Sequence, residues 1–90
     1  MHFTERKDIV NKLKEHGYKH TEDAMGIKVH INQTQYIDIS RGGEGDLYLD
    51  IYTNGKINPN SLEILEDHGR IRFDSLIKVL DIVKKNLKKN

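Results

Sequence analysis

The first apolar stripe of the chain follows helical spacing. Three apolar residues recur at that spacing and share one face: Ile9, Val10 and Leu13. This period predicts an amphipathic helix over about residues 4–16. Thr4 belongs to the residue types that cap helix N-termini, and Gly17 suits the left-handed conformation that commonly ends a helix. We therefore expect Thr4 to cap the helix and Gly17 to terminate it.

The period then changes to two residues, which is typical of strands. Three runs show this alternation: residues 27–31, 36–40 and 46–52. Aliphatic residues take the inward positions, namely Ile27, Val29, Ile31, Ile37, Ile39, Leu47, Leu49 and Ile51. Because the links between the runs are short, we expect an antiparallel meander. The dipeptide Asn54-Gly55 is typical of a tight hairpin turn, after which Ile57 is expected to begin a short fourth strand.

The glycine-rich stretch SRGGEGD joins the second and third of these runs. A phosphate-binding loop requires a helix directly after its glycines, whereas the residues that follow this stretch have strand periodicity. We therefore interpret it as the tip of a hairpin. Two registers of that hairpin keep the aliphatic residues on one face. We expect the register that places Asp38 opposite Tyr48, because the other places Asp38 opposite Asp50, and like charges directly opposite are destabilising unless a cation lies between them.

Residues 60–68 carry two conflicting signals. Asn60 followed three residues later by Glu63 is typical of a helix start, which favours a short helix. Leu62 and Ile64 alternate instead as in a strand, and this remains the alternative for the segment.

The end of the chain has the clearest pattern. A brief extended piece is expected over residues 70–73, followed by a helix that Asp74 caps and that continues to about residue 88. Its apolar stripe consists of Leu76, Val79, Leu80, Val83 and Leu87, flanked by Ile77 and Ile82. Such a continuous stripe indicates a helix that packs on a core.

These elements predict a single α+β domain over residues 1–90. An N-terminal helix precedes an antiparallel meander of three to four strands. A short helix and then the C-terminal helix follow. We expect both long helices to pack on the aliphatic face of the sheet, where the C-terminal helix supplies most of the buried contacts.

Composition excludes several classes of activity. The chain has 15 basic and 14 acidic residues, so no overall field selects nucleic acid or anionic membrane. It has no cysteine, which excludes disulfides and thiol nucleophiles, and we expect no metal site and no cofactor. No apolar run is typical of a secretion signal or a membrane span, so we expect a cytoplasmic protein. Lysine outnumbers arginine and Ile and Asn are frequent, which indicates an A+T-rich microbial or phage genome.

The other face of the sheet carries the candidate functional residues. Its outward positions, which we call the polar face, are Lys28, His30, Tyr36, Asp38, Tyr48, Asp50 and Tyr52. Three tyrosines on a water-facing sheet exceed what strand propensity requires, and tyrosine is enriched at protein interfaces. The leading hypothesis is therefore a non-enzymatic, monomeric or homodimeric protein-binding module. A phage or mobile-element regulator or an immunity-type inhibitor would fit.

Two alternatives rest on other residues. If Ile31 pairs with Ile37, a row of His30, Asp38 and Tyr48 crosses three strands and offers material for a general base or a divalent ion. Neither a nucleophile nor a second histidine accompanies that row. Nucleic-acid binding is the other alternative, and it would use the basic residues near the end of the chain: Arg70, Arg72, Lys84, Lys85, Lys88 and Lys89.

Overall fold

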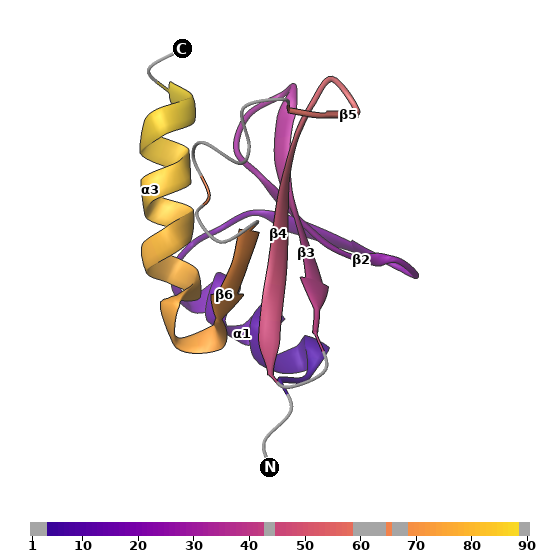
Figure 1. Cartoon of the computed structure of the whole chain (residues 1–90), viewed down its shortest axis with the longest axis vertical. Helices are drawn as coiled ribbons and strands as arrows, with labels where there is room; N and C mark the ends of the chain where they lie inside the picture. Colours follow the sequence, from indigo (N-terminus) through magenta and orange to yellow (C-terminus); the bar gives the residue numbers. More distant parts are fainter. Residues whose placement is uncertain (1–3, 43–44, 59–64, 66–68, 89–90) are drawn as a thin grey trace.

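A computed structural model describes residues 4–42, 45–58, 65 and 69–88, with the side chain of Lys88 excepted. The described elements are α1 (Arg6–Glu15), β1 (His20–Asp23), β2 (Gly26–His30), β3 (Gln35–Arg41), β4 (Asp46–Thr53), β5 (Lys56–Ile57), β6 (Arg70–Arg72), a 3-10 turn (Phe73–Ser75) and α3 (Leu76–Lys88). The predicted α+β fold is confirmed, with a few more strands than expected (Figure 1). The segment predicted as a short helix, 60–68, lies outside the described residues except for Leu65, which is buried.

The strands form one antiparallel sheet in the order β1-β2-β3-β4-β5, and β6 also pairs with β4. β4 is the longest strand and has β3 on one side, with β5 and β6 on the other side near its two ends. The extended piece predicted after Gly69 is confirmed as β6. β1 was not predicted, because its sequence HTED is polar and its side chains are largely exposed. Such a strand has no apolar alternation to reveal it.

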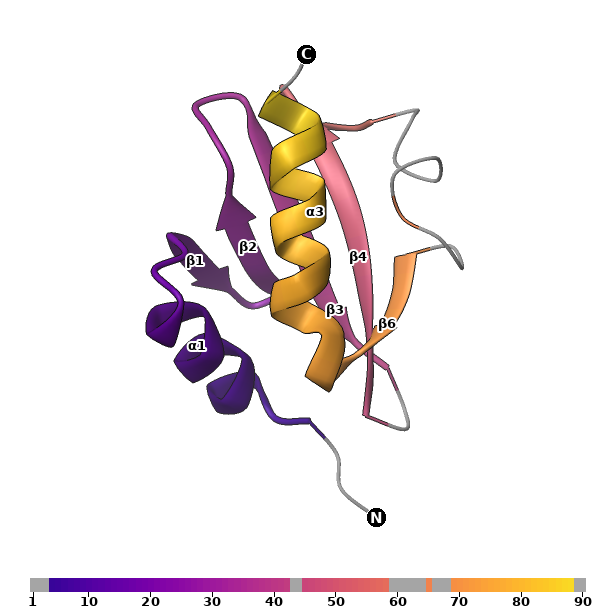
Figure 2. The ribbon, with the colours of Figure 1, turned by 90° about the vertical axis from the view of Figure 1, so that its left-hand side faces the viewer.

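One cluster of buried residues joins both helices to the inward face of the sheet. It contains Ile9, Val10 and Leu13 of α1, the inward residues of β2 to β4, and Leu76, Leu80, Val83 and Leu87 of α3. In Figure 2, α3 crosses in front of β3 and β4, and α1 lies beside it next to β1 and β2. The predicted packing of both helices on the aliphatic face of the sheet is therefore confirmed. None of the described helices is long and apolar enough to cross a membrane.

The ends of the two helices differ in part from the predicted ones. Glu5, not Thr4, is the N-cap of α1, and its backbone N–H donates to Asp8 Oδ2 at 3.1 Å. Thr4 Oγ1 donates instead to the carbonyl oxygen of Gly45 at 3.2 Å. Gly17 has the expected left-handed φ, +73°. α3 begins at Leu76 after the 3-10 turn, so Asp74 lies inside that turn and does not cap the α-helix.

The predicted register between β3 and β4 is wrong by two residues. Asp38 lies opposite Asp50, and Tyr48 lies opposite Ser40. This register pairs Ile37 with Ile51 on the inward face. It also stacks Tyr36 on Tyr52, with ring centroids 5.0 Å apart and planes within 5°. A stacked aromatic pair stabilises the fold by about 0.5–1.5 kcal/mol. This gain offsets the repulsion between Asp38 and Asp50, whose free-energy cost at half-exposed positions is of similar size.

The register between β2 and β3 is not the one that would pair Ile31 with Ile37, because Val29 takes that place. His30 lies opposite Tyr36, and Lys28 lies opposite Asp38. His30 Nε2 lies 2.9 Å from Thr21 Oγ1, so the imidazole is directed towards β1. The predicted row of His30, Asp38 and Tyr48 is therefore not formed. Asp38 has Lys28 and Asp50 as its cross-strand neighbours, in place of His30 and Tyr48.

Candidate functional site

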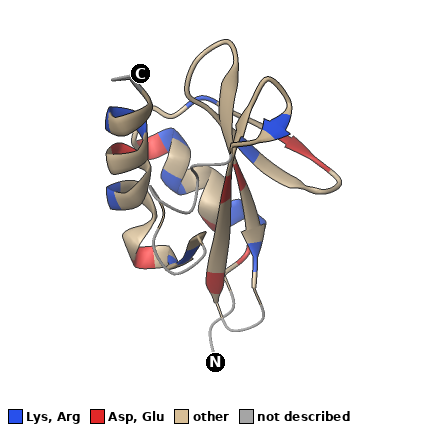
Figure 3. Ribbon diagram, turned by 45° about the horizontal axis from the view of Figure 1, so that its top comes forward, with Lys and Arg blue, Asp and Glu red and all other residues tan. Residues whose placement is uncertain are grey.

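Strand alternation places all seven residues of the polar face on the side of the sheet opposite the core. Cross-strand neighbours there form three rows: Lys28–Asp38–Asp50, His30–Tyr36–Tyr52 and Ser40–Tyr48–Arg70. The residues of these rows are half-buried, except that His30, Tyr48 and Arg70 are exposed. Figure 3 shows acidic positions along β4, which contributes one residue to each of these rows. The face therefore combines aromatic rings with carboxylates on neighbouring strands.

An aromatic platform occupies the row at one end of the face. Tyr36 and Tyr52 stack in parallel, and the ring of His30 lies 6.3 Å from Tyr36 at a tilt. Lys28 Nζ lies 5.4 Å from the centre of the Tyr36 ring. Tyr48 is separate from this platform, because it belongs to the row with Ser40. The three tyrosines of the polar face thus form one stacked pair and one exposed ring.

The row beside the platform carries excess negative charge. Lys28 lies opposite Asp38, but its Nζ forms an ion pair with Asp23 Oδ2 at 3.2 Å. Partial burial raises the pKa of Asp38, the negative charge of Asp50 raises it further, and Lys28 offsets only part of this. Partial burial and the same two aspartates raise the pKa of the Tyr52 hydroxyl. The centre of the polar face would therefore be stabilised by an added cation.

The pKa shift of Asp38 predicts a stability effect that depends on pH. A carboxyl group with a raised pKa in the folded state favours folding when protonated, and it becomes unfavourable as pH rises through that raised pKa. We expect Asp38→Asn to increase the free energy of unfolding at pH 7 by roughly 0.2–1 kcal/mol, the range for cross-strand pairs. Urea unfolding at pH 7 and pH 4 measures this, and the gain should shrink at pH 4. Asp74→Asn, at an exposed position off the sheet, is the control, and a less stable Asp38→Asn variant at pH 7 would refute the expectation.

A metal ion is one cation that two carboxylates attract. Within the residues that the structure describes, no group of three or more His, Asp or Glu side chains is arranged to hold a metal. Asp38 and Asp50 alone supply few of the six to eight oxygen ligands that calcium takes. The pair is better matched by a guanidinium or ammonium group, which donates hydrogen bonds to carboxylates and also stacks on tyrosine.

The described basic residues of the nucleic-acid alternative lie on two separate elements. Arg70 is on β6, where its Nε donates to Asp46 Oδ2 at 2.8 Å, and Arg72 lies opposite Asp46 in the same strand pair. Lys84 is on α3. At a rise of 1.5 Å per residue it lies about 12 Å from the first residue of that helix, Leu76, and its Nζ lies over the ring of Tyr18. Figure 3 shows acidic and basic positions interspersed along α3. Lys85 is exposed, whereas Lys89 and the side chain of Lys88 lie outside the described residues.

The sequence predicted the members of the polar face but missed the part that β1 contributes. Asp23 at the end of β1 accepts the backbone N–H groups of Met25 at 2.8 Å and Gly26 at 3.0 Å, and it also holds Lys28. An aspartate three residues before a glycine is a turn signal that could have revealed this hairpin. Searches of protein-family models, curated proteins and solved structures find no match to this chain.

Proposed function

We propose that the protein is a binding module whose polar face takes an arginine or lysine side chain of a partner protein. The observation that carries the proposal is the stacked Tyr36–Tyr52 pair beside the cross-strand pair Asp38–Asp50. Tyrosine rings attract a cation over their faces, and the aspartates supply hydrogen-bond acceptors next to them. A guanidinium group matches both features, because it is planar, stacks on aromatic rings and donates to carboxylates.

The charge of the face favours a protein partner over a nucleic acid. A phosphate backbone would meet Asp38 and Asp50 at the centre of the face, and both would repel it. A protein segment can instead place one cation there and cover the tyrosines with apolar side chains. Tyr48, 41% exposed, extends the surface that such a segment would bury.

Selection from a displayed random peptide library on the immobilised protein tests the proposal. We expect the enriched peptides to share an arginine or lysine. Asp50→Asn should weaken binding of such a peptide about fivefold to tenfold, the equivalent of about 1–1.4 kcal/mol for one ion pair beside an aromatic ring. Truncation of the platform with Tyr36→Ala should weaken it as well.

Asp74→Asn is the matched control, because it removes one negative charge from an exposed position outside the polar face. It should bind the selected peptides as tightly as the wild type. Enrichment of peptides without a cationic residue would refute the proposal, and so would equal affinity of the wild type and Asp50→Asn. Backbone amide shifts in nuclear magnetic resonance spectra should locate the bound peptide on β2 to β4.

A further inference from the structure

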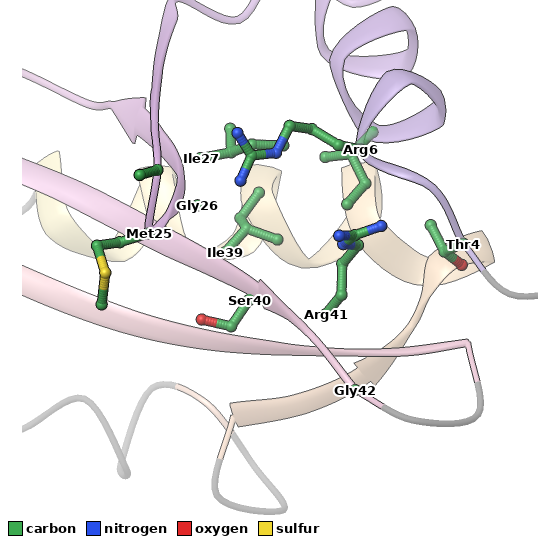
Figure 4. Close-up of a pocket in the computed structure, with 11 residues that line it drawn as sticks. Thr4, Arg6, Met25, Gly26, Ile27, Ile39, Ser40, Arg41 and Gly42 are labelled. Atoms are coloured by element: carbon green, nitrogen blue, oxygen red, sulfur yellow. The ribbon is translucent and has the colours of Figure 1, made fainter.

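A pocket of about 440 Å³ lies at the opposite end of α1 from Gly17. The first turn of α1, the turn between β1 and β2, and the end of β3 surround it. Figure 4 shows the residues that line it, among them Arg6 of α1, Met25 of the turn, and Ser40 and Arg41 of β3. The volume falls in the range of small-molecule sites, roughly 300–1,000 Å³.

Two arginines bring their charge to this pocket from different elements. Arg6 reaches across the pocket from α1, and Arg41 extends from the end of β3 towards the same space (Figure 4). Arg6 Nη1 donates to the backbone carbonyl oxygen of Asp23 at 2.8 Å, which positions the guanidinium but leaves its charge unneutralised. Among the residues that the structure describes, Arg41 has no ion pair. Both guanidinium groups retain free donors.

The described carboxylates nearest to the pocket have other partners. The carboxylate of Asp23 is held by Lys28 and by two backbone N–H groups of its own turn. Glu5 forms an ion pair with Lys7 at 3.2 Å, and Asp8 accepts the backbone N–H of Glu5. Each of these carboxylates thus has a partner other than Arg6 or Arg41. Two cationic groups in a concave site focus a positive potential.

The remaining lining suits a ligand with a carbon body. The β2–β3 ladder ends at the pair Ile27–Ile39, so the next residues of β3 border the pocket on that side and pair with β4 on the other. Ser40 also lines the pocket, but its side chain lies on the opposite side of β3 from Arg41, in the row with Tyr48 (Figure 4). The apolar part of the lining includes Ile39 and Met25, whose side chain is 87% exposed. An exposed methionine at the rim of a pocket offers an adaptable apolar contact.

From this arrangement we infer that the pocket binds a small anion, with its oxyanion group held between Arg6 and Arg41. Carboxylate and phosphate share the chemistry that guanidinium groups recognise, namely paired oxygens that accept parallel hydrogen bonds. Neither arginine belongs to the seven residues of the polar face, although Ser40, which lines the pocket, lies in a row of that face. Its ligand would leave the tyrosines of the polar face uncovered.

Titration of the full chain with three sodium salts tests the inference by nuclear magnetic resonance at constant ionic strength. Benzoate supplies a carboxylate on an apolar ring, inorganic phosphate supplies the oxyanion alone, and chloride is the control. We expect benzoate or phosphate to shift the backbone amides of Met25, Ser40 and Arg41 in a saturable manner, and chloride to leave them unchanged. Binding of benzoate alone assigns an organic carboxylate, whereas binding of phosphate alone assigns a phosphate group.

Variants separate a built site from general attraction to a basic surface. Arg6→Gln and Arg41→Gln should each lower the affinity for the anion at least tenfold. Lys14→Gln is the matched control, because it removes the same charge from an exposed position near the other end of α1, and its affinity should equal that of the wild type. The inference is overturned if neither anion saturates, if the shifts lie on α3, or if Lys14→Gln weakens binding as much as Arg41→Gln. Circular dichroism confirms that each variant is folded.

Discussion

Leu80→Asp is expected to unfold the domain. Leu80 is 0% exposed and lies in the middle of the apolar stripe of α3, within the single core cluster. Loss of the buried aliphatic group costs about 2–5 kcal/mol, and a buried carboxylate without a partner adds several more. A 90-residue domain has a total stability of about 5–13 kcal/mol, so the two penalties approach or exceed it. Far-UV circular dichroism and thermal unfolding measure the result.

Ile82→Asp provides the matched control on the same helix. Ile82 lies two residues away from Leu80 and is 47% exposed, so the aspartate there remains in contact with water. Its effect on the free energy of unfolding should stay near 1 kcal/mol or below. A folded Leu80→Asp variant with a cooperative thermal transition would contradict the packing of α3 on the sheet.

Gly69→Ala should have the second largest effect, a loss of about 2–5 kcal/mol. Gly69 has φ of +79°, in the left-handed region where a side chain costs about 1–2 kcal/mol. A Cβ atom at this position would also lie 2.2 Å from the carbonyl oxygen of Leu49 in β4. That overlap forces the chain entering β6 away from β4, with a further cost of about 1–3 kcal/mol. The midpoint of urea unfolding measures the change.

Gly55→Ala isolates the contribution of the close contact. Gly55 also has φ of +79°, but nothing lies within 4 Å of the Cβ position there. Gly55→Ala should therefore lower the free energy of unfolding only by the cost of the left-handed conformation, about 1–2 kcal/mol. Equal losses in the two variants would show that β6 does not depend on the close approach of Gly69 to Leu49.

The core was predictable from local patterns. Ile37 and Leu49 each lie in a run with a period of two, and Leu80 and Val83 lie on one helical stripe. All four are buried as expected. The left-handed Gly17 was predictable for the same reason, because the conformation of a helix end depends on the residues next to it.

The neighbours within the polar face were not predictable from the same information. The expected register differed from the observed one by two residues, and either would have kept Ile37, Ile39 and Leu49 inward. The choice depended on whether the Tyr36–Tyr52 stack outweighs the repulsion between Asp38 and Asp50, and each of these effects is near 1 kcal/mol. Differences of that size are below what residue types alone resolve.

The sequence by itself determined the buried aliphatic residues of the two long helices and of β2 to β4, because periodicity is a property of neighbouring residues along one chain. Only the tertiary structure decided that Asp38 faces Asp50, that the polar strand β1 joins the sheet, and that Arg6 and Arg41 share a pocket. These relations join residues that are far apart in sequence or whose alternatives differ little in energy. They therefore depend on the packing of the whole domain and not on any local pattern.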